Sequence, residues 1–456
     1  MYQETFFTKD RDLYKYLLPL FLMVALQNLV AYSVNMADNM MLGHYSQAAL
    51  NGATTVNSIF FIVQQIALSV GEALVVLASQ YWGERRLSPV RRVTGIAVKL
   101  AFICGVAAIV ISALMPSQLI AIFTKDAAVI SEGVIYLSII KYTFLLFLLT
   151  NVLMAALRSV EIVKISFGIS LVSLIINVAI NYTLIFGRFG FPEMGIRGAA
   201  IGTLIARIVE FLIVIVFLWK KDTRLQLFSE NFLKFDRQLR TDYRKVFMPV
   251  LISQILWAVS IPIQTGILGR LSSNALAANS VATTFYQYLK VVVQAMSLTS
   301  AVMIGKAVGE GSDAKVREDA RTLSVLSLVV GIILGLLLFA LRMPLLTIYS
   351  GLSPEALKLA DQLIILMCFV MVGMSYQMPV SAGIMRGAGD VKFMANMNLI
   401  CIWCIVMPLS FMAAFWWKLP VVWVVLCIQS DQVFKSIPVF VHFKKHQWIK
   451  KRTQEA

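Results

Sequence analysis

The stretch YLLPLFLMVALQNLVAYSVNMADNMML, residues 16–42, decides how this chain folds. It is an apolar run with one charged side chain, the carboxylate of Asp38. As a helix it would be about 40 Å long, enough to cross a hydrocarbon layer of about 30 Å. An aspartate inside such a helix costs about 2.5–3.5 kcal/mol on insertion scales, and its helical neighbours three and four residues away include no cation. An acid placed in this way is by default a proton or cation site.

The composition of the whole chain indicates a polytopic membrane protein. Of its 456 residues, 59% are hydrophobic and 14% are charged, whereas soluble domains are roughly 45–50% apolar. The apolar runs are continuous rather than alternating, which predicts helices rather than a barrel. The net charge of +16 does not indicate nucleic-acid binding, because the basic residues alternate between loops. No small-residue cleavage site follows the first run, so we expect it to stay as the first span.

Twelve spans are expected, and the basic residues fall mainly in the connections after even-numbered spans. By the positive-inside rule, this places both termini in the cytoplasm of a cell whose plasma or inner membrane holds the protein. We expect a monomer that needs no cofactor. The predicted spans are residues 16–42, 50–80, 94–114, 130–155, 165–187, 197–219, 246–268, 276–305, 322–341, 357–384, 393–416 and 421–443.

The two halves of the chain repeat each other. Leu42-Gly43 recurs as Leu268-Gly269, 226 residues later, and Gly83-Glu84 recurs as Gly309-Glu310 at the same offset. The fold class predicted is therefore an all-α membrane protein with two pseudo-symmetric lobes of six helices, related as parallel repeats. We expect the first lobe at residues 1–219, a cytoplasmic linker at 220–245 and the second lobe at 246–456.

Asparagines in the first lobe can surround Asp38. Asn177 and Asn181 are four residues apart and share a helix face. Asn35 lies one turn before Asp38, and Asn151 belongs to the fourth span. Such amides can hydrogen-bond a carboxylate or supply oxygen ligands to a hard cation. A lone aspartate with amides suits either a proton or a sodium ion, so the coupling ion stays open.

Several longer motifs make the chain resemble the multidrug and toxin extrusion (MATE) family. They are residues 38–43 (DNMMLG), 181–187 (NYTLIFG), 195–203 (GIRGAAIGT) and 386–390 (RGAGD). The resemblance covers the whole chain and implies an antiporter that exports amphipathic, often cationic compounds in exchange for protons or sodium ions. Resemblance to the DinF-like branch supports Asp38, Asn151, Asn177 and position 181 as the coupling site. The chain departs from that branch at Asn181, where many relatives have a second aspartate.

Other intramembrane charges compete with Asp38. The NorM-like branch also places acids in the second lobe, but residues 246–305 contain no Asp or Glu, which predicts coupling through the first lobe alone. Glu72 has no cation one turn away and is a possible second acid. The other charged residues are expected to pair within one helix (Arg207 with Glu210, Asp431 with Lys435), or to snorkel or pair elsewhere (Lys99, Lys141, Lys290).

Candidate substrate contacts lie in the eighth and tenth spans. Methionine and aromatic side chains make adaptable surfaces for varied ligands, although such a stripe also suits helix packing. Gly331 and Gly335 form a GxxxG, which indicates close packing of helices. The candidate chamber residues are Tyr286, Tyr288, Met371, Met374 and Tyr376.

Two other classes of protein remain as alternatives. A flippase for lipid-linked precursors belongs to the same superfamily, but it would be expected to line its groove with several cations. The interiors of the spans, away from their first two residues, hold only five Lys or Arg. An enzyme is not expected, because no H-E-x-x-H, G-x-S-x-G or P-loop pattern occurs. Cys401 and Cys404 form a C-x-x-C with no second pair or histidine nearby, so we expect packing rather than a metal site, apart from a possible sodium ion at Asp38.

Overall fold

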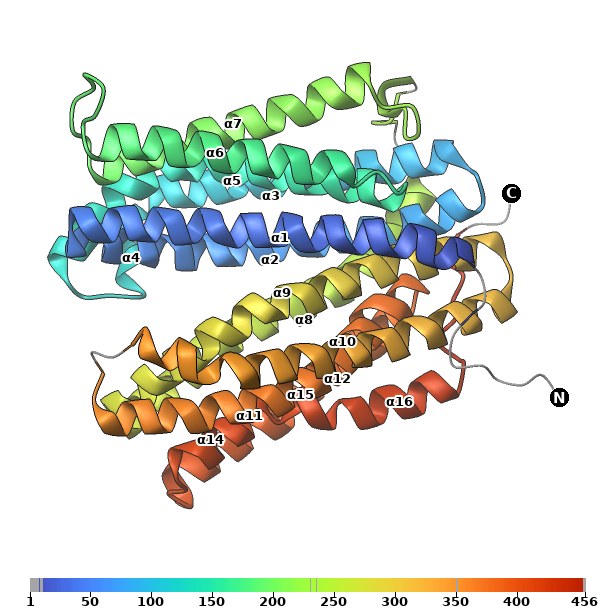
Figure 1. Cartoon of the computed structure of the whole chain (residues 1–456). Helices are drawn as coiled ribbons and strands as arrows, with labels where there is room; N and C mark the ends of the chain where they lie inside the picture. The colour runs from blue at the N-terminus through green and yellow to red at the C-terminus, as the bar shows by residue number, and fades with distance from the viewer. Residues whose placement is uncertain (1–7, 9–10, 230, 235, 350–351, 454–456) are drawn as a thin grey trace. The chain divides into compact units, whose positions relative to one another are not determined.

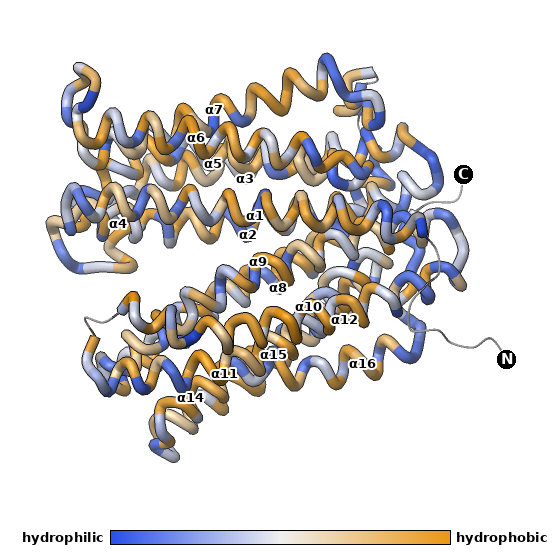
Figure 2. Tube along the Cα trace, viewed as in Figure 1, coloured by the Kyte–Doolittle hydropathy of each residue, from blue (hydrophilic) through white to orange (hydrophobic). Residues whose placement is uncertain are grey.

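The computed structural model describes residues 8, 11–229, 231–234, 236–349 and 352–453. Within these ranges, twelve helices are long and apolar enough to cross a membrane, as predicted. Hydrophobic residues line their lengths, and hydrophilic residues gather toward their ends (Figure 2). Most helices begin or end several residues beyond the predicted apolar spans, because polar end turns continue the helix outside the apolar stretch.

Contacts along the chain divide it into two compact units. The first unit is residues 26–251 and the second is residues 1–25 with 252–456. Two long helices, α1 (Arg11–Tyr45) and α8 (Arg237–Leu271), contribute to both units. The other helices of the first unit are α2 (Gln47–Gly83), α3 (Leu87–Leu114), α4 (Pro116–Ala121), α5 (Ala127–Ser159), α6 (Lys164–Ile185), α7 (Ile196–Lys220) and η1 (Leu227–Ser229).

Small residues bring two helices of the first unit close together. Helices α6 and α7 pack on each other, and α7 also packs on α5; all three run side by side in Figure 1. Gly198 and Gly202 lie four residues apart on one face of α7, and a Cβ at Gly198 would lie 2.8 Å from the carbonyl oxygen of Leu184 on α6. Only glycine permits this approach, which places polar side chains of α6 directly against α7.

The second unit contains the helices of the predicted second lobe and a hydrophobic core. Its helices are α9 (Ser273–Glu310), α10 (Asp313–Thr347), α11 (Pro354–Met378), η2 (Pro379–Met385), α12 (Val391–Leu399), η3 (Ile400–Val406), α13 (Met407–Phe411), η4 (Met412–Trp416), α14 (Val421–Gln429), α15 (Asp431–Phe434) and α16 (Ser436–Lys444). A Cβ at Gly331 would collide with Ser375, and one at Gly335 would lie 3.0 Å from the carbonyl oxygen of Cys368. The GxxxG of α10 therefore allows close helix packing, as predicted, and its partner is α11.

The polar stretch after α7 is ordered by contacts within the first unit. The guanidinium of Arg91 donates to the carbonyl oxygen of Leu225 over 2.9 Å, and Leu225 and Leu227 are fully buried. Helix α8 begins at Arg237, nine residues before the apolar span predicted from residue 246. Tyr243, in these early turns, donates its hydroxyl to the carbonyl oxygen of Val70 over 2.8 Å.

The loop at residues 386–390 holds the C-terminal segment of the second unit. Asp390 is 1% exposed, and its carboxylate contacts Nζ of Lys450 and Nε2 of His442, each over 2.8 Å. The backbone amide of Lys450 donates to the carbonyl oxygen of Ala388 over 2.9 Å. This family-like loop therefore has a structural role in anchoring the end of the chain.

Candidate functional site

The carboxylate of Asp38 is buried in the first unit and meets an amide of another helix. Its residue is 7% exposed on α1, and its Oδ1 accepts a hydrogen bond of 2.6 Å from Nδ2 of Asn181 on α6. Asn181 is fully buried. Within the part of the chain that the structure describes, Asp38 forms no ion pair, so the neighbouring dipoles carry much of its solvation.

A chain of polar side chains continues from this pair. Nδ2 of Asn181 also reaches Oδ1 of Asn177 over 3.4 Å, and Nδ2 of Asn177 donates to Oγ1 of Thr203 on α7 over 3.1 Å. Thr203 and the guanidinium of Arg207 are close enough to interact electrostatically with Asp38, as is Tyr136 on α5. The site thus combines one acid from α1 with polar groups from three further helices.

The side-chain oxygen of Asn181 is free to coordinate a cation. Among the described residues, its Oδ1 is buried and has no hydrogen-bond partner. This oxygen packs directly against Gly202 of α7, where an added Cβ would collide with it. A buried amide oxygen beside a carboxylate is a fitting ligand for sodium, and it is equally an acceptor for a protonated carboxyl group. Both proposed coupling ions therefore suit the residues present.

The structure brings together three of the five predicted coupling residues. Asp38, Asn177 and Asn181 form the hydrogen-bonded group, whereas the contacts described for Asp38 include neither Asn35 nor Asn151. Asn35 is exposed on α1. Asn151 lies on α5 with its Oδ1 3.1 Å from the position of a Cβ at Gly71 of α2. The possible second acid, Glu72, is the next residue on α2 and is partly buried.

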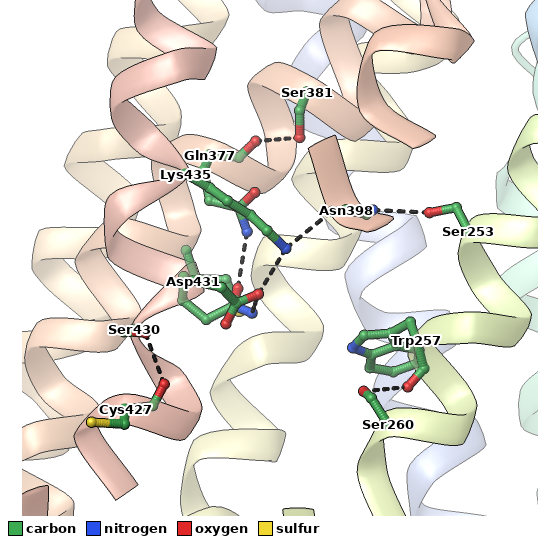
Figure 3. Close-up of polar contacts among 12 residues, drawn as sticks. Ser253, Trp257, Ser260, Gln377, Ser381, Asn398, Cys427, Ser430, Asp431 and Lys435 are labelled. Atoms are coloured by element: carbon green, nitrogen blue, oxygen red, sulfur yellow. Dashed lines mark hydrogen bonds and ion pairs between the residues drawn. The ribbon is translucent and has the colours of Figure 1, made fainter. Parts of the chain in front are cut away.

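The competing charges pair as expected. Nη1 of Arg207 lies 2.6 Å from Oε2 of Glu210, and Nζ of Lys435 lies 2.7 Å from Oδ2 of Asp431; the second pair is drawn in Figure 3. The intramembrane lysines contact neighbouring groups. Lys99 donates to the carbonyl oxygen of Leu233, while Lys141 and Lys290 lie over the rings of Tyr142 and Trp257.

The candidate chamber residues divide into two groups. Met371, Met374 and Tyr286 belong to the hydrophobic core of the second unit, and the hydroxyl of Tyr286 donates to Sδ of Met374 over 2.9 Å. Tyr288 is partly buried on α9. Tyr376 is partly buried on α11, with its ring centroid 6.5 Å from that of Phe440. In this arrangement the methionine stripe packs helices together.

Sequence reasoning missed Tyr136, Thr203 and Gly202 as parts of the Asp38 site. Thr203 and Gly202 end the family-like motif at residues 195–203, and Gly198 with Gly202 is itself a GxxxG. That spacing could have predicted a close approach to α7, and with it the position of Thr203. Tyr136 has no such signal, because its proximity to Asp38 depends on long-range packing of α5.

Twelve spans and a buried acid held by amides define a polytopic membrane transporter. The family model described as MatE matches residues 23–183 and 249–412, more than half of the chain. The chain therefore belongs to the MatE family of multidrug efflux transporters, as its motifs predicted.

Curated relatives and solved structures agree with this assignment. The probable multidrug resistance protein YoeA of Bacillus subtilis (strain 168) is 25% identical over 91% of this chain and 89% of its own length. The probable multidrug resistance protein NorM of Thermotoga maritima is 24% identical, over 93% of this chain and 91% of its own. The structure of the Vibrio cholerae MATE transporter VcmN covers 97% of this chain and 98% of its own, with a TM-score of 0.87 and 17% identity, which shows the shared fold.

Proposed function

We propose that this protein is a proton- or sodium-coupled antiporter that exports amphipathic, often cationic organic compounds. The single observation that carries the proposal is the Asp38–Asn181 pair, a buried carboxylate without a cation partner among the described residues. The names of the curated relatives support multidrug export as the transport reaction. They do not favour the flippase alternative.

The amide of Asn181 can serve Asp38 in two states. In the observed arrangement its Nδ2 donates to the carboxylate, which suits the charged form of Asp38. When Asp38 is protonated it becomes a donor, and a turn of the same amide would present the unpartnered Oδ1 as its acceptor. A sodium ion would instead bind the carboxylate together with that oxygen. Each ion therefore favours a different hydrogen-bond arrangement across α1, α6 and α7.

Coupling follows from different ion affinities in two conformations of the transporter. We propose that ion binding at Asp38 repacks the first unit during alternating access and releases the exported compound. A ligand shifts such an equilibrium only by its difference in affinity between the two states. We also propose that the protein acts in the plasma membrane, as a monomer of the DinF-like branch. The alternating basic connections support an orientation with both termini in the cytoplasm.

Dye transport in vesicles with imposed gradients tests this function. The cationic dye rhodamine B methyl ester is followed separately under a proton and a sodium gradient. We expect one gradient to drive uphill transport by the wild type and the Asp38→Asn variant to lose it. Glu72→Gln makes the same kind of change at the possible second acid and should retain transport, because we propose that Asp38 binds the coupling ion. Full gradient-driven transport by Asp38→Asn would refute the assignment.

A further inference from the structure

The second unit contains a cluster of buried and partly buried charged and polar side chains that the Asp38 site does not use. We define the Lys290 cluster as Lys290, Trp257, Asp431, Lys435 and Asn398. Asp431 and Lys435 are 5% and 3% exposed. Figure 3 shows the side chains of Asp431, Lys435 and Asn398 directed toward one another.

Lys435 and Asp431 satisfy each other and their polar neighbours. Besides its ion pair, Nζ of Lys435 donates to Oδ1 of Asn398 over 3.0 Å, and Nδ2 of Asn398 donates to Oγ of Ser253 over 3.0 Å. Oδ2 of Asp431 also accepts from Nε2 of Gln432 over 3.0 Å. This pair is neutral overall and needs no further ion.

Lys290 supplies a second cation that the pair does not neutralise. Its Nζ lies 5.1 Å from the ring centroid of Trp257 on α8, and it interacts electrostatically with Asp431. In the described ranges, Lys290 forms no hydrogen bond or ion pair. It lies near the middle of α9, about 25 Å from the first residue of the helix and about 30 Å from the last at the helical rise. This position along a spanning helix places it near the middle of the membrane. A cation at this depth is costly and marks a functional site by default.

The two halves carry opposite net charges around a pair of positions that the internal repeat relates. The 228-residue offset that relates Arg158 to Arg386 also relates Thr203 to Asp431 and Arg207 to Lys435. Around Thr203, the charges of Asp38, Glu210 and Arg207 leave an excess of one negative charge. Around Asp431, the charges of Asp431, Lys435 and Lys290 leave an excess of one positive charge. The net negative charge around Thr203 favours binding of a cation, and the net positive charge around Asp431 favours binding of an anion.

We propose that the Lys290 cluster binds an anionic group, such as a carboxylate, of the exported compound. The ammonium of Lys290 has three N–H donors for that group, and the ring of Trp257 holds its side chain in place. The substrates would then include amphipathic compounds that carry a carboxylate, alone or together with a cationic centre. This inference rests on the proposed export function and specifies its substrate class.

Two dyes that differ only by a free carboxylate test the proposal. Rhodamine B carries the carboxylate and rhodamine B methyl ester does not. Binding of each dye to the purified full-length protein in lipid nanodiscs is measured by fluorescence anisotropy, with chloride replaced by gluconate. In Lys290→Gln we expect the Kd for rhodamine B to rise about tenfold, the loss of one hydrogen bond to a charged group, while the Kd for the ester is unchanged. Lys290→Arg should keep both.

A lysine elsewhere on α9 provides the matched control. Lys306 lies over the ring of Tyr16, with Nζ 5.0 Å from the ring centroid, sixteen residues further along the helix. Lys306→Gln removes the same charge from a similar ring contact and should leave both dye affinities unchanged. Retained binding of the ester also shows that Lys290→Gln is folded.

Three results would overturn the proposal. The first is an equal effect of Lys290→Gln on both dyes, or none on either. The second is a wild type that binds the ester but not rhodamine B. The third is a chloride-dependent change in tryptophan fluorescence that Lys290→Gln abolishes while rhodamine B binding stays intact, which would assign the cluster to an inorganic anion. Failure of the proposed export function is distinguished from these results by the vesicle assay. In that case neither a proton nor a sodium gradient would drive transport of the ester.

Discussion

Replacing Gly202 by alanine tests the geometry of the proposed coupling site without removing a polar group. The added Cβ would collide with Oδ1 of Asn181, whose Nδ2 donates to Asp38. The amide must therefore move, and its hydrogen bond to the carboxylate is broken or lengthened. Overpacking lowers the free energy of unfolding by about 1–3 kcal/mol, and the higher helix propensity of alanine raises it by about 1 kcal/mol. The variant should therefore fold.

The size and sign of the effect follow from the lost hydrogen bond. A hydrogen bond to a charged group contributes about 1.5–3 kcal/mol, and 1.4 kcal/mol corresponds to a factor of ten in an equilibrium constant. The charged form of Asp38 loses this stabilisation, so a proton would be bound about tenfold more tightly and the activity profile would move about one unit to higher pH. A sodium ion would instead lose an amide oxygen and need about tenfold more sodium. The two coupling ions thus give shifts of opposite sign.

The assay is the rate of gradient-driven export of rhodamine B methyl ester from vesicles, measured as a function of ion concentration. Gly331→Ala is the matched control, because the same substitution there crowds the side chain of Ser375 in the other unit. That variant should keep the wild-type ion dependence. If Gly202→Ala also keeps it, while Asn181→Ala changes it, Gly202 does not position the amide and our reasoning about this contact is wrong.

Three further substitutions test other contacts. Thr203→Val leaves Nδ2 of Asn177 without its acceptor, at a cost of about 1–3 kcal/mol, and should lower the Tm of the purified protein; an unchanged Tm argues against that bond. Lys435→Met leaves Asp431 buried and unpaired, at a cost of about 3–5 kcal/mol, and adding Asp431→Leu should recover most of the Tm; no recovery would show that the pair is not the cause. Asp390→Asn weakens the contacts of Lys450 and His442, and should speed trypsin cleavage at Lys450, measured by mass spectrometry; wild-type cleavage rates would contradict the anchoring role.

The spans could be predicted from the sequence because a membrane requires long apolar helices. Their ends could not, because polar turns continue a helix beyond the apolar stretch, as at the start of α8 at Arg237. Close packing at Gly331 and Gly335 was predictable because a GxxxG lets a neighbouring helix approach closely. That this neighbour is α11 was not predictable from the spacing.

The hydrogen-bonded group around Asp38 was predictable as far as helical periodicity extends. The four-residue spacing places Asn177 and Asn181 on one face of α6, and the structure joins Asn181 to both Asp38 and Asn177. The positions of Tyr136 and Asn151 depend on how α5 is rotated against its neighbours, which the spacing of residues within one helix does not determine. The charge of Lys290 was visible in the sequence, but its proximity to Asp431 was not, because α9 and the last span are far apart along the chain.

Displacement of bound dye by the coupling ion tests the central claim most directly. Rhodamine B methyl ester is bound to the wild type and to Asp38→Asn in nanodiscs, and the coupling ion is then titrated while anisotropy is recorded. If Asp38 exchanges its ion for the exported compound, the ion should release dye from the wild type and leave the dye on Asp38→Asn. Equal release from both proteins would contradict the account.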